Sequence, residues 1–258
     1  NFANTLDIGG DARLVAGDLV DLLRQEGKPR QATPWVDGLN RKRAEFWLQS
    51  ESSLHSDAVP IKPQRIIHAL NQRLTSPAIV IADAGTPTPY ITRFLKLQGG
   101  GSRFLIPRSF GGLGYSIPAV VGAHLARPEA RLVALFGDGS LGMSAGELET
   151  LVRLKIPAVL IHFNNGCFGW IKALQALHSR GKFQSVDFTA ANMAPVAEGF
   201  GMKAFHVESP QELEAGLDRA FSSRDPVFLD IVTESEISEL PPVFSWLKKG
   251  GKKEASLA

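Results

Sequence analysis

The sequence is poor in cysteine, in long apolar runs and in surplus charge of one sign, and each shortage excludes something. Cys167 is the one cysteine in 258 residues, so no disulfide can form within the chain, which fits a reducing, cytoplasmic compartment. No stretch approaches eighteen consecutive apolar residues, so no membrane span is expected. The hydrophobic fraction of 44% is ordinary for a soluble globular protein.

The charge is nearly balanced, at a net +2 with a pI near 8.7. Segment 248–254 holds four lysines and one glutamate, a net +3, so the rest of the chain is close to neutral at −1. Such a tail is usually solvated, and we therefore expect no nucleic-acid partner.

The first 60 residues differ in pattern from the rest. The opening stretch "NFANTLDIGGDARLVAGDLVDLLRQ" predicts a strand, a Gly-Gly-Asp turn and an amphipathic helix from about Ala12 to Arg24. One strand and one helix cannot close a core, so residues 1–24 are interpreted as the end of a domain whose beginning is missing. Residues 25–60 predict a linker containing a possible short helix at Gly38–Ser50.

After Pro63 apolar strands alternate with helices. We expect strands within 77–85, 130–139, 157–165 and 226–233, and helices within 63–74, 117–126, 144–154 and 209–221. Two of these helices open with a capping-box pattern, Ser144 with Glu147 and Ser209 with Glu212. This alternation predicts an α/β fold, a doubly wound parallel sheet with helices on both faces.

Such sheets bind ligands in the loops at the carboxyl ends of their parallel strands. Three segments follow expected strands in this way: 84–89, 137–143 and 164–169. Asp138 and Asn165 each follow a strand and lie one strand–helix–strand crossover apart. A carboxylate, an amide oxygen and a nearby carbonyl suit Mg²⁺, which completes its octahedron with water and phosphate. Gly137 and Gly139 would let a diphosphate approach the backbone, near amides that favour an anion.

The Gly-Asp-Gly motif followed by Asn-Asn at this spacing resembles the signature of thiamin diphosphate enzymes. Throughout "GDGSLGMSAGELETLVRLKIPAVLIHFNNGCFGWIK" the chain resembles the diphosphate-binding domain of the 2-oxoacid decarboxylase and acetolactate synthase branch. The resemblance implies Mg²⁺ ligands at Asp138, Asn165 and the main chain of Cys167. It also implies that Gly139, Ser140 and Gly169 lie along the diphosphate.

Two further segments resemble this family. "FGGLGYSIPAVVGA" at 110–123 is similar to the aminopyrimidine-binding segment, in its benzoylformate decarboxylase-like form. There Leu113 would bend the cofactor, and the Gly111 carbonyl would accept from its amino group. "DAGTP" at 83–87 is similar to a loop that contacts the diphosphate through Gly85 and Thr86. A nicotinamide fingerprint is rejected, because it needs glycine where Ile117 stands.

The resemblance as a whole predicts one set of cofactor-binding residues: Gly85, Thr86, Gly111, Gly112, Leu113, Gly137, Asp138, Gly139, Ser140, Asn165, Cys167, Phe168 and Gly169. Phe168 and Trp170 could line a substrate pocket or pack in the core. Inside its strand, His162 is expected to be a hydrogen-bonded buried histidine, whereas His55 and His178 are expected at the surface.

The resemblance implies a thiamin diphosphate- and Mg²⁺-dependent enzyme that decarboxylates a 2-oxo acid. An acetolactate synthase-like carboligase is the alternative. A second alternative, in which the chain has no activity of its own, is an inactive fragment or a non-catalytic subunit. No catalytic residue is assigned, because the activating glutamate of this family belongs to a pyrimidine-binding domain. That domain would come from a missing N-terminal part or from another subunit of a homodimer or homotetramer. Whether the missing middle domain binds a flavin is not determined by this sequence.

On this interpretation the chain divides into the end of a middle domain (1–24), a linker (25–60), a diphosphate- and Mg²⁺-binding domain (61–235) and a C-terminal tail (236–258). The tail could close over the cofactor or dock on the outer surface.

Overall fold

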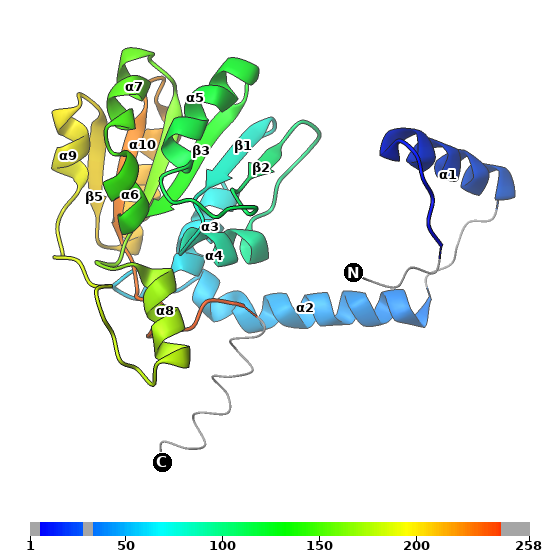
Figure 1. Ribbon diagram of the computed structural model, residues 1–258, viewed down its shortest axis with the longest axis horizontal. Coiled ribbons are helices and arrows are strands. Elements are labelled where there is room, and N and C mark those ends of the chain that lie inside the picture. The colour runs from blue at the N-terminus through cyan, green and yellow to red at the C-terminus, as the bar shows by residue number, and fades with distance from the viewer. Residues whose placement is uncertain (1–5, 28–32, 244–258) are drawn as a thin grey trace. The chain divides into compact units, whose positions relative to one another are not determined.

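The computed structural model describes residues 6–27 and 33–243, in two units, Asn1–Gln49 and Ser50–Ala258 (Figure 1). The first unit holds α1 (Ala12–Glu26), which begins after Asp11 and ends at Gly27. The Asp11 carboxylate accepts from the amides of Arg13 and Leu14, and Gly27 adopts the left-handed conformation that ends many helices. The helix expected over 12–24 is therefore confirmed.

The first 60 residues differ from the expectation in two respects. Leu6–Gly9 form no strand, and the preceding residues of the expected strand lie outside the described part. The helix expected at 38–50 is α2 (Pro34–Leu54), which is longer at both ends. Pro34 reads as a breaker in the sequence, yet it is the first residue of the helix, where a missing amide hydrogen costs nothing.

The second unit contains a six-stranded, all-parallel sheet in the order β2-β1-β3-β4-β6-β5. Its strands are β1 (Ala78–Ala82), β2 (Arg103–Leu105), β3 (Arg131–Gly137), β4 (Ala158–Asn164), β5 (Lys203–Val207) and β6 (Val227–Val232). All residues of β1 and β4 are buried, as expected for strands covered on both faces.

Helices cover both faces of the sheet (Figure 1). On one face lie α5 (Ser116–Ala126), α6 (Asp138–Ser144), α7 (Glu147–Arg153) and α9 (Ala194–Gly199), and on the other α3 (Pro63–Asn71), α4 (Pro87–Phe94) and α10 (Pro210–Ser222). Side chains such as Ile117, Val120 and Leu148 pack on the strands to form the core of the first face. The doubly wound α/β fold is thus confirmed.

The edge strands β2 and β5 were not expected from the sequence. β2 is only three residues long, and β5 carries partly exposed residues, including Lys203 and His206. An edge strand has one neighbour and less apolar burial, so its apolar pattern is weak.

One of the two expected capping boxes was wrong. Ser209 and Glu212 form a complete capping box at the start of α10. Ser144, by contrast, is the last residue of α6, and its hydroxyl donates to the Ser140 carbonyl. Because Gly146 precedes α7 without a side-chain cap, Ser144 and Glu147 do not form the reciprocal pair.

Among the described residues, every helix is too short or too polar to traverse a lipid bilayer. The expected tail at 236–258 is described only as far as Val243, so most of that prediction lies outside the described residues.

Candidate cofactor site

The strand order places a cavity where a doubly wound sheet binds ligands. The chain runs from β1 outward to β2 and then returns to β3 on the other side of β1, so the order reverses between β1 and β3. A cavity of about 420 Å³ lies among the loops that follow β1, β2, β3 and β4. It is lined by Ala84, Gly85, Thr86, Pro87, Pro107, Arg108, Gly111, Leu113, Gly137, Asp138, Gly139, Ser140, Cys167, Phe168, Gly169, Trp170 and Ile171.

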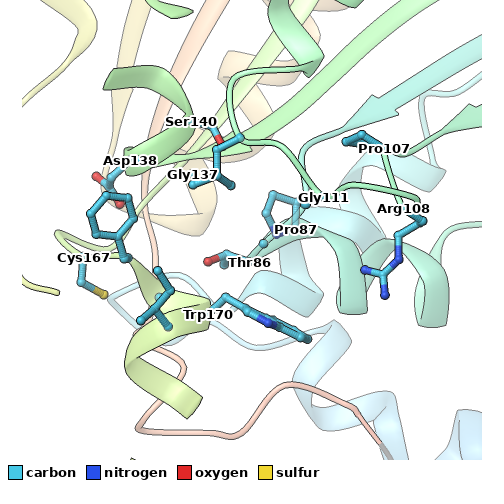
Figure 2. Close-up of a pocket in the computed structure, with 17 residues that line it drawn as sticks. Thr86, Pro87, Pro107, Arg108, Gly111, Gly137, Asp138, Ser140, Cys167 and Trp170 are labelled. Atoms are coloured by element: carbon cyan, nitrogen blue, oxygen red, sulfur yellow. The ribbon is translucent and has the colours of Figure 1, made fainter. Parts of the chain in front are cut away.

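The predicted residues are largely brought together in this cavity. Figure 2 shows Asp138 and Cys167 at one end and Pro107 and Arg108 at the other. Of the predicted set, Gly112 and Asn165 do not line it; Asn165 lines a neighbouring cavity. Phe168 and Trp170 both contribute to the wall, so their pocket interpretation is consistent with the structure.

Asp138 is the first residue of α6, directly after β3. Its side chain is 6% exposed, and Oδ2 accepts a hydrogen bond from the backbone N–H of Asn165 at 3.1 Å. β3 and β4 are paired with Gly137 opposite Phe163, so the two loops leave the sheet side by side. The predicted pair of Asp138 and Asn165 is therefore in direct contact.

Asn165 is held by two further contacts. Its Nδ2 donates to Oε2 of Glu236 at 2.9 Å, and its Oδ1 lies 3.2 Å from the Cys167 thiol. Burial, followed by the negative charge of Glu236, raises the pKa of Cys167 to about 12. The thiol therefore stays protonated near neutral pH, which makes it a poor nucleophile.

His162 lies behind Asp138 and is completely buried in β4. Its Nδ1 is 2.8 Å from Asp230, and its Nε2 is 3.6 Å from Asp138 Oδ1. Burial lowers the pKa of His162, but the two carboxylates raise it more, so the net shift is upward. The expectation of a buried histidine with a hydrogen-bond partner is met, and His55 and His178 are exposed as expected.

Two predicted glycines have little room for a side chain. A Cβ at Gly139 would collide with the Phe168 ring, and one at Gly169 would collide with the Glu236 carboxylate. Gly85 and Gly111 instead have positive φ angles of 147° and 72°, which favour glycine. The side chain of Leu113 approaches Gly85, its Cδ2 lying 4.0 Å from where a Cβ would be.

Buried Asp83 holds the loop that carries Leu113. Its carboxylate accepts from the amides of Tyr115 and Ser116 at 2.7 and 3.2 Å, and from the Ser116 hydroxyl at 2.6 Å. The loop between β2 and α5 is thereby tied to the end of β1, beside the cavity.

Sequence reasoning missed Glu236, which it assigned to the tail. Glu236 is 1% exposed, and its Oε2 accepts a hydrogen bond from the Asn165 side chain. Burial, and to a smaller extent the charge of Asp138, raises its pKa. The surrounding "TESEISEL" has the composition of a solvated acidic run, so no local signal marks this glutamate as buried.

The donors in this region suit a cation that also binds phosphate. The described residues hold no group of three or more His, Cys, Asp or Glu side chains able to bind a metal. The expected set differs from such a group, since it has one carboxylate, one amide oxygen and one carbonyl. Mg²⁺ commonly takes few protein oxygens and fills its other positions with water and phosphate.

Comparison with known proteins defines the class. The family described as "Thiamine pyrophosphate enzyme, C-terminal TPP binding domain" matches residues 83–231, more than half of the chain. The chain belongs to this family, whose cofactor is thiamin diphosphate (thiamine pyrophosphate).

Individual relatives carry several names. The chain is 31% identical over 234 residues to an acetolactate synthase large subunit of Porphyra purpurea, covering 89% of this chain and 38% of that one. It is 30% identical over 240 residues to a 2-hydroxyacyl-CoA lyase of Oryza sativa subsp. japonica, covering 88% and 41%. This chain thus spans about two fifths of the relatives it matches.

A solved structure supports the fold. A thiamine diphosphate-dependent 4-hydroxybenzoylformate decarboxylase of Rhodococcus jostii RHA1 superposes with a TM-score of 0.64 at 24% identity. The match covers 70% of this chain and 34% of that one.

Proposed function

We propose that this chain binds thiamin diphosphate through a Mg²⁺ ion and forms the diphosphate-binding half of an active site for a 2-oxo acid. The observation that carries the proposal is the hydrogen bond from the backbone N–H of Asn165 to the Asp138 carboxylate, which brings the loops after β3 and β4 together. The Asp138 carboxylate lies there in the wall of a cavity of about 420 Å³, which is within the range of cofactor sites.

Within this proposal each residue has a definite task. The Asp138 carboxylate, Asn165 Oδ1 and the Cys167 carbonyl hold the cation, and the backbone at Gly139, Ser140 and Gly169 faces the diphosphate. Leu113, the Gly111 carbonyl and the Gly85–Thr86 loop line the same cavity and would contact the rest of the cofactor. When bound, thiamin diphosphate supplies the electron sink for cleaving the bond next to the 2-oxo group.

The reaction proposed first is non-oxidative decarboxylation of a 2-oxo acid, supported by the Gly-Gly-Leu-Gly-aromatic form of residues 111–115. Transfer to an acceptor carbonyl, as in acetolactate synthases, is the second candidate, supported by the names of several relatives. A pyrimidine-binding domain from a longer parent chain or another subunit would complete the site in a homodimer or homotetramer. Products from pyruvate and benzoylformate, measured with that domain present, separate the two reactions.

Asp138→Asn tests the cation site, since it keeps the size of the side chain and removes its charge. In the wild type, Mg²⁺ and thiamin diphosphate together should raise the melting temperature, by about 2.7 kcal/mol of added stability at one hundred times Kd. We expect either component alone, or both with Asp138→Asn, to give less than half of that rise in differential scanning fluorimetry.

Asp225→Asn is the matched control, because Asp225 forms an exposed ion pair with Lys203 at 2.9 Å. It should keep the full response. A wild type that does not respond to the two ligands would contradict the proposal and favour the non-catalytic alternative. A full rise in the melting temperature of Asp138→Asn would show that Asp138 is not a cation ligand.

A further inference from the structure

Glu236 reaches the site from a segment that the family match does not include. The match ends at Ile231, in β6, and Glu236 lies five residues beyond it. Its side chain is buried, and Oε2 accepts from Asn165 Nδ2 at 2.9 Å.

The neighbouring glutamates hold this segment in place. Glu234 and Glu239 both bind the ammonium group of Lys62, at 2.8 and 2.6 Å, and Glu239 also accepts from Gln64. The Glu234 amide donates to the Ile61 carbonyl at 3.0 Å. With both flanks tied to residues 61–64, Glu236 is directed toward Asn165 and away from solvent.

The contact decides which end of the Asn165 amide is available. The amide presents its NH₂ group to Glu236, whose Oε2 accepts the hydrogen bond. Oδ1 is then directed elsewhere, toward Cys167, whose thiol lies 3.2 Å away. The opposite orientation would face two oxygens against each other and turn NH₂ toward the cation.

We propose that Glu236 is a positioning residue, whose carboxylate orients the Asn165 amide so that its oxygen is the atom offered to the divalent cation. This inference rests on the proposed function, because it assigns Asn165 Oδ1 as a cation ligand. Outer groups of this kind typically change metal affinity by 10- to 100-fold. Glu236 acts through Asn165 and contributes no proton transfer.

Glu236→Gln tests the inference with almost no change of volume. Glutamine can face Asn165 with either end of its amide, so the fixed orientation is lost. We expect the apparent Kd for Mg²⁺, titrated at saturating thiamin diphosphate and followed by calorimetry, to rise about tenfold or more. Glu239→Gln removes the same charge from the same segment while Glu234 still binds Lys62, and it should stay within about twofold of the wild type.

A double variant separates positioning from a direct role of Glu236. In Asn165→Asp combined with Glu236→Gln, the new amide can donate to the new carboxylate, and either end of that carboxylate is an oxygen. We expect this double variant to recover most of the Mg²⁺ affinity lost in Glu236→Gln. A direct cation ligand at Glu236 would not be rescued in this way.

Three outcomes would overturn the inference: unchanged Mg²⁺ affinity in Glu236→Gln, an equal loss in Glu239→Gln, or no recovery in the double variant. If Glu236→Gln does not fold, Glu236→Asp keeps the charge but shortens the side chain, and it should weaken Mg²⁺ binding in the same direction. A wild type without any Mg²⁺-dependent binding of thiamin diphosphate would defeat the proposed function itself. A responsive wild type with an unaffected Glu236→Gln would defeat only this inference.

Discussion

Gly139 and Gly142 lie three positions apart in α6 but have different surroundings. A Cβ at Gly139 would collide with the Phe168 ring, whereas a Cβ at Gly142 meets nothing within 4 Å. Neither glycine needs a positive φ angle, so the difference comes from packing. The glycine predicted to admit the diphosphate also admits a neighbouring aromatic ring.

Gly139→Ala should therefore destabilise the protein by about 1–3 kcal/mol, the usual cost of overpacking. Gly142→Ala should be neutral or stabilise it by up to about 1 kcal/mol, because alanine favours an exposed helix position. Urea unfolding measures both. Equal stability of the two variants would mean that the Phe168 ring moves aside without cost.

At the scale of elements, two S-x-x-E patterns had different outcomes. Ser209 is extended, with φ −128° and ψ 156°, and Pro210 follows it, so a helix starts there. Ser144 ends a helix that β3 leads into directly. The four-residue pattern does not encode whether the preceding residues are already helical, so it predicted only one box correctly.

The capping box of α10 gives the protein a pH-dependent stability. Hydrogen bonds from the amides of Glu208 and Ser209 lower the pKa of Glu212, and nearby His206 acts in the same direction. A lowered carboxyl pKa contributes stability above the unfolded-state pKa, about 4.3, and that contribution is lost as the pH falls.

Glu212→Gln should consequently be less stable than the wild type near pH 6, with the difference shrinking as the pH falls below about 4. Urea unfolding at several pH values provides the measurement. Ser209→Ala is the control, since its hydroxyl does not titrate and its loss of about 1 kcal/mol should persist. A difference for Glu212→Gln that grows on acidification would contradict this assignment.

At the scale of the whole molecule, the two units differ in burial. No residue of α1 is buried, and even its apolar side chains Leu14, Leu19, Leu22 and Leu23 are exposed. The strands of the second unit, by contrast, lie in a continuous core. Helices of this length gain most of their stability from packing, so α1 alone is marginal.

Amide hydrogen exchange should show this contrast. We expect α1 to exchange within seconds, and β1, β3 and β4 to exchange slowest, at rates near those of global unfolding. Mass spectrometry of pepsin fragments resolves the elements. Strong protection of α1 would mean that another surface covers it, and protection that rises with protein concentration would identify that surface as a second copy.

The sequence by itself determined the parallel α/β fold, because apolar strands alternate with helices along the chain. It also determined the pairing of Asp138 with Asn165, because each follows a strand and one strand–helix–strand crossover separates them. It also indicated Leu113 and the glycine-rich loops through the family resemblance. Only the tertiary structure decided that the loops after β1, β2, β3 and β4 enclose one cavity where the strand order reverses, since the order of strands in a sheet cannot be read from their order in the sequence. It likewise placed Glu236 against Asn165, 71 residues away. Within an acidic run, which glutamate is buried depends on contacts with residues distant in the sequence, such as Asn165 for Glu236 and Lys62 for the flanking glutamates.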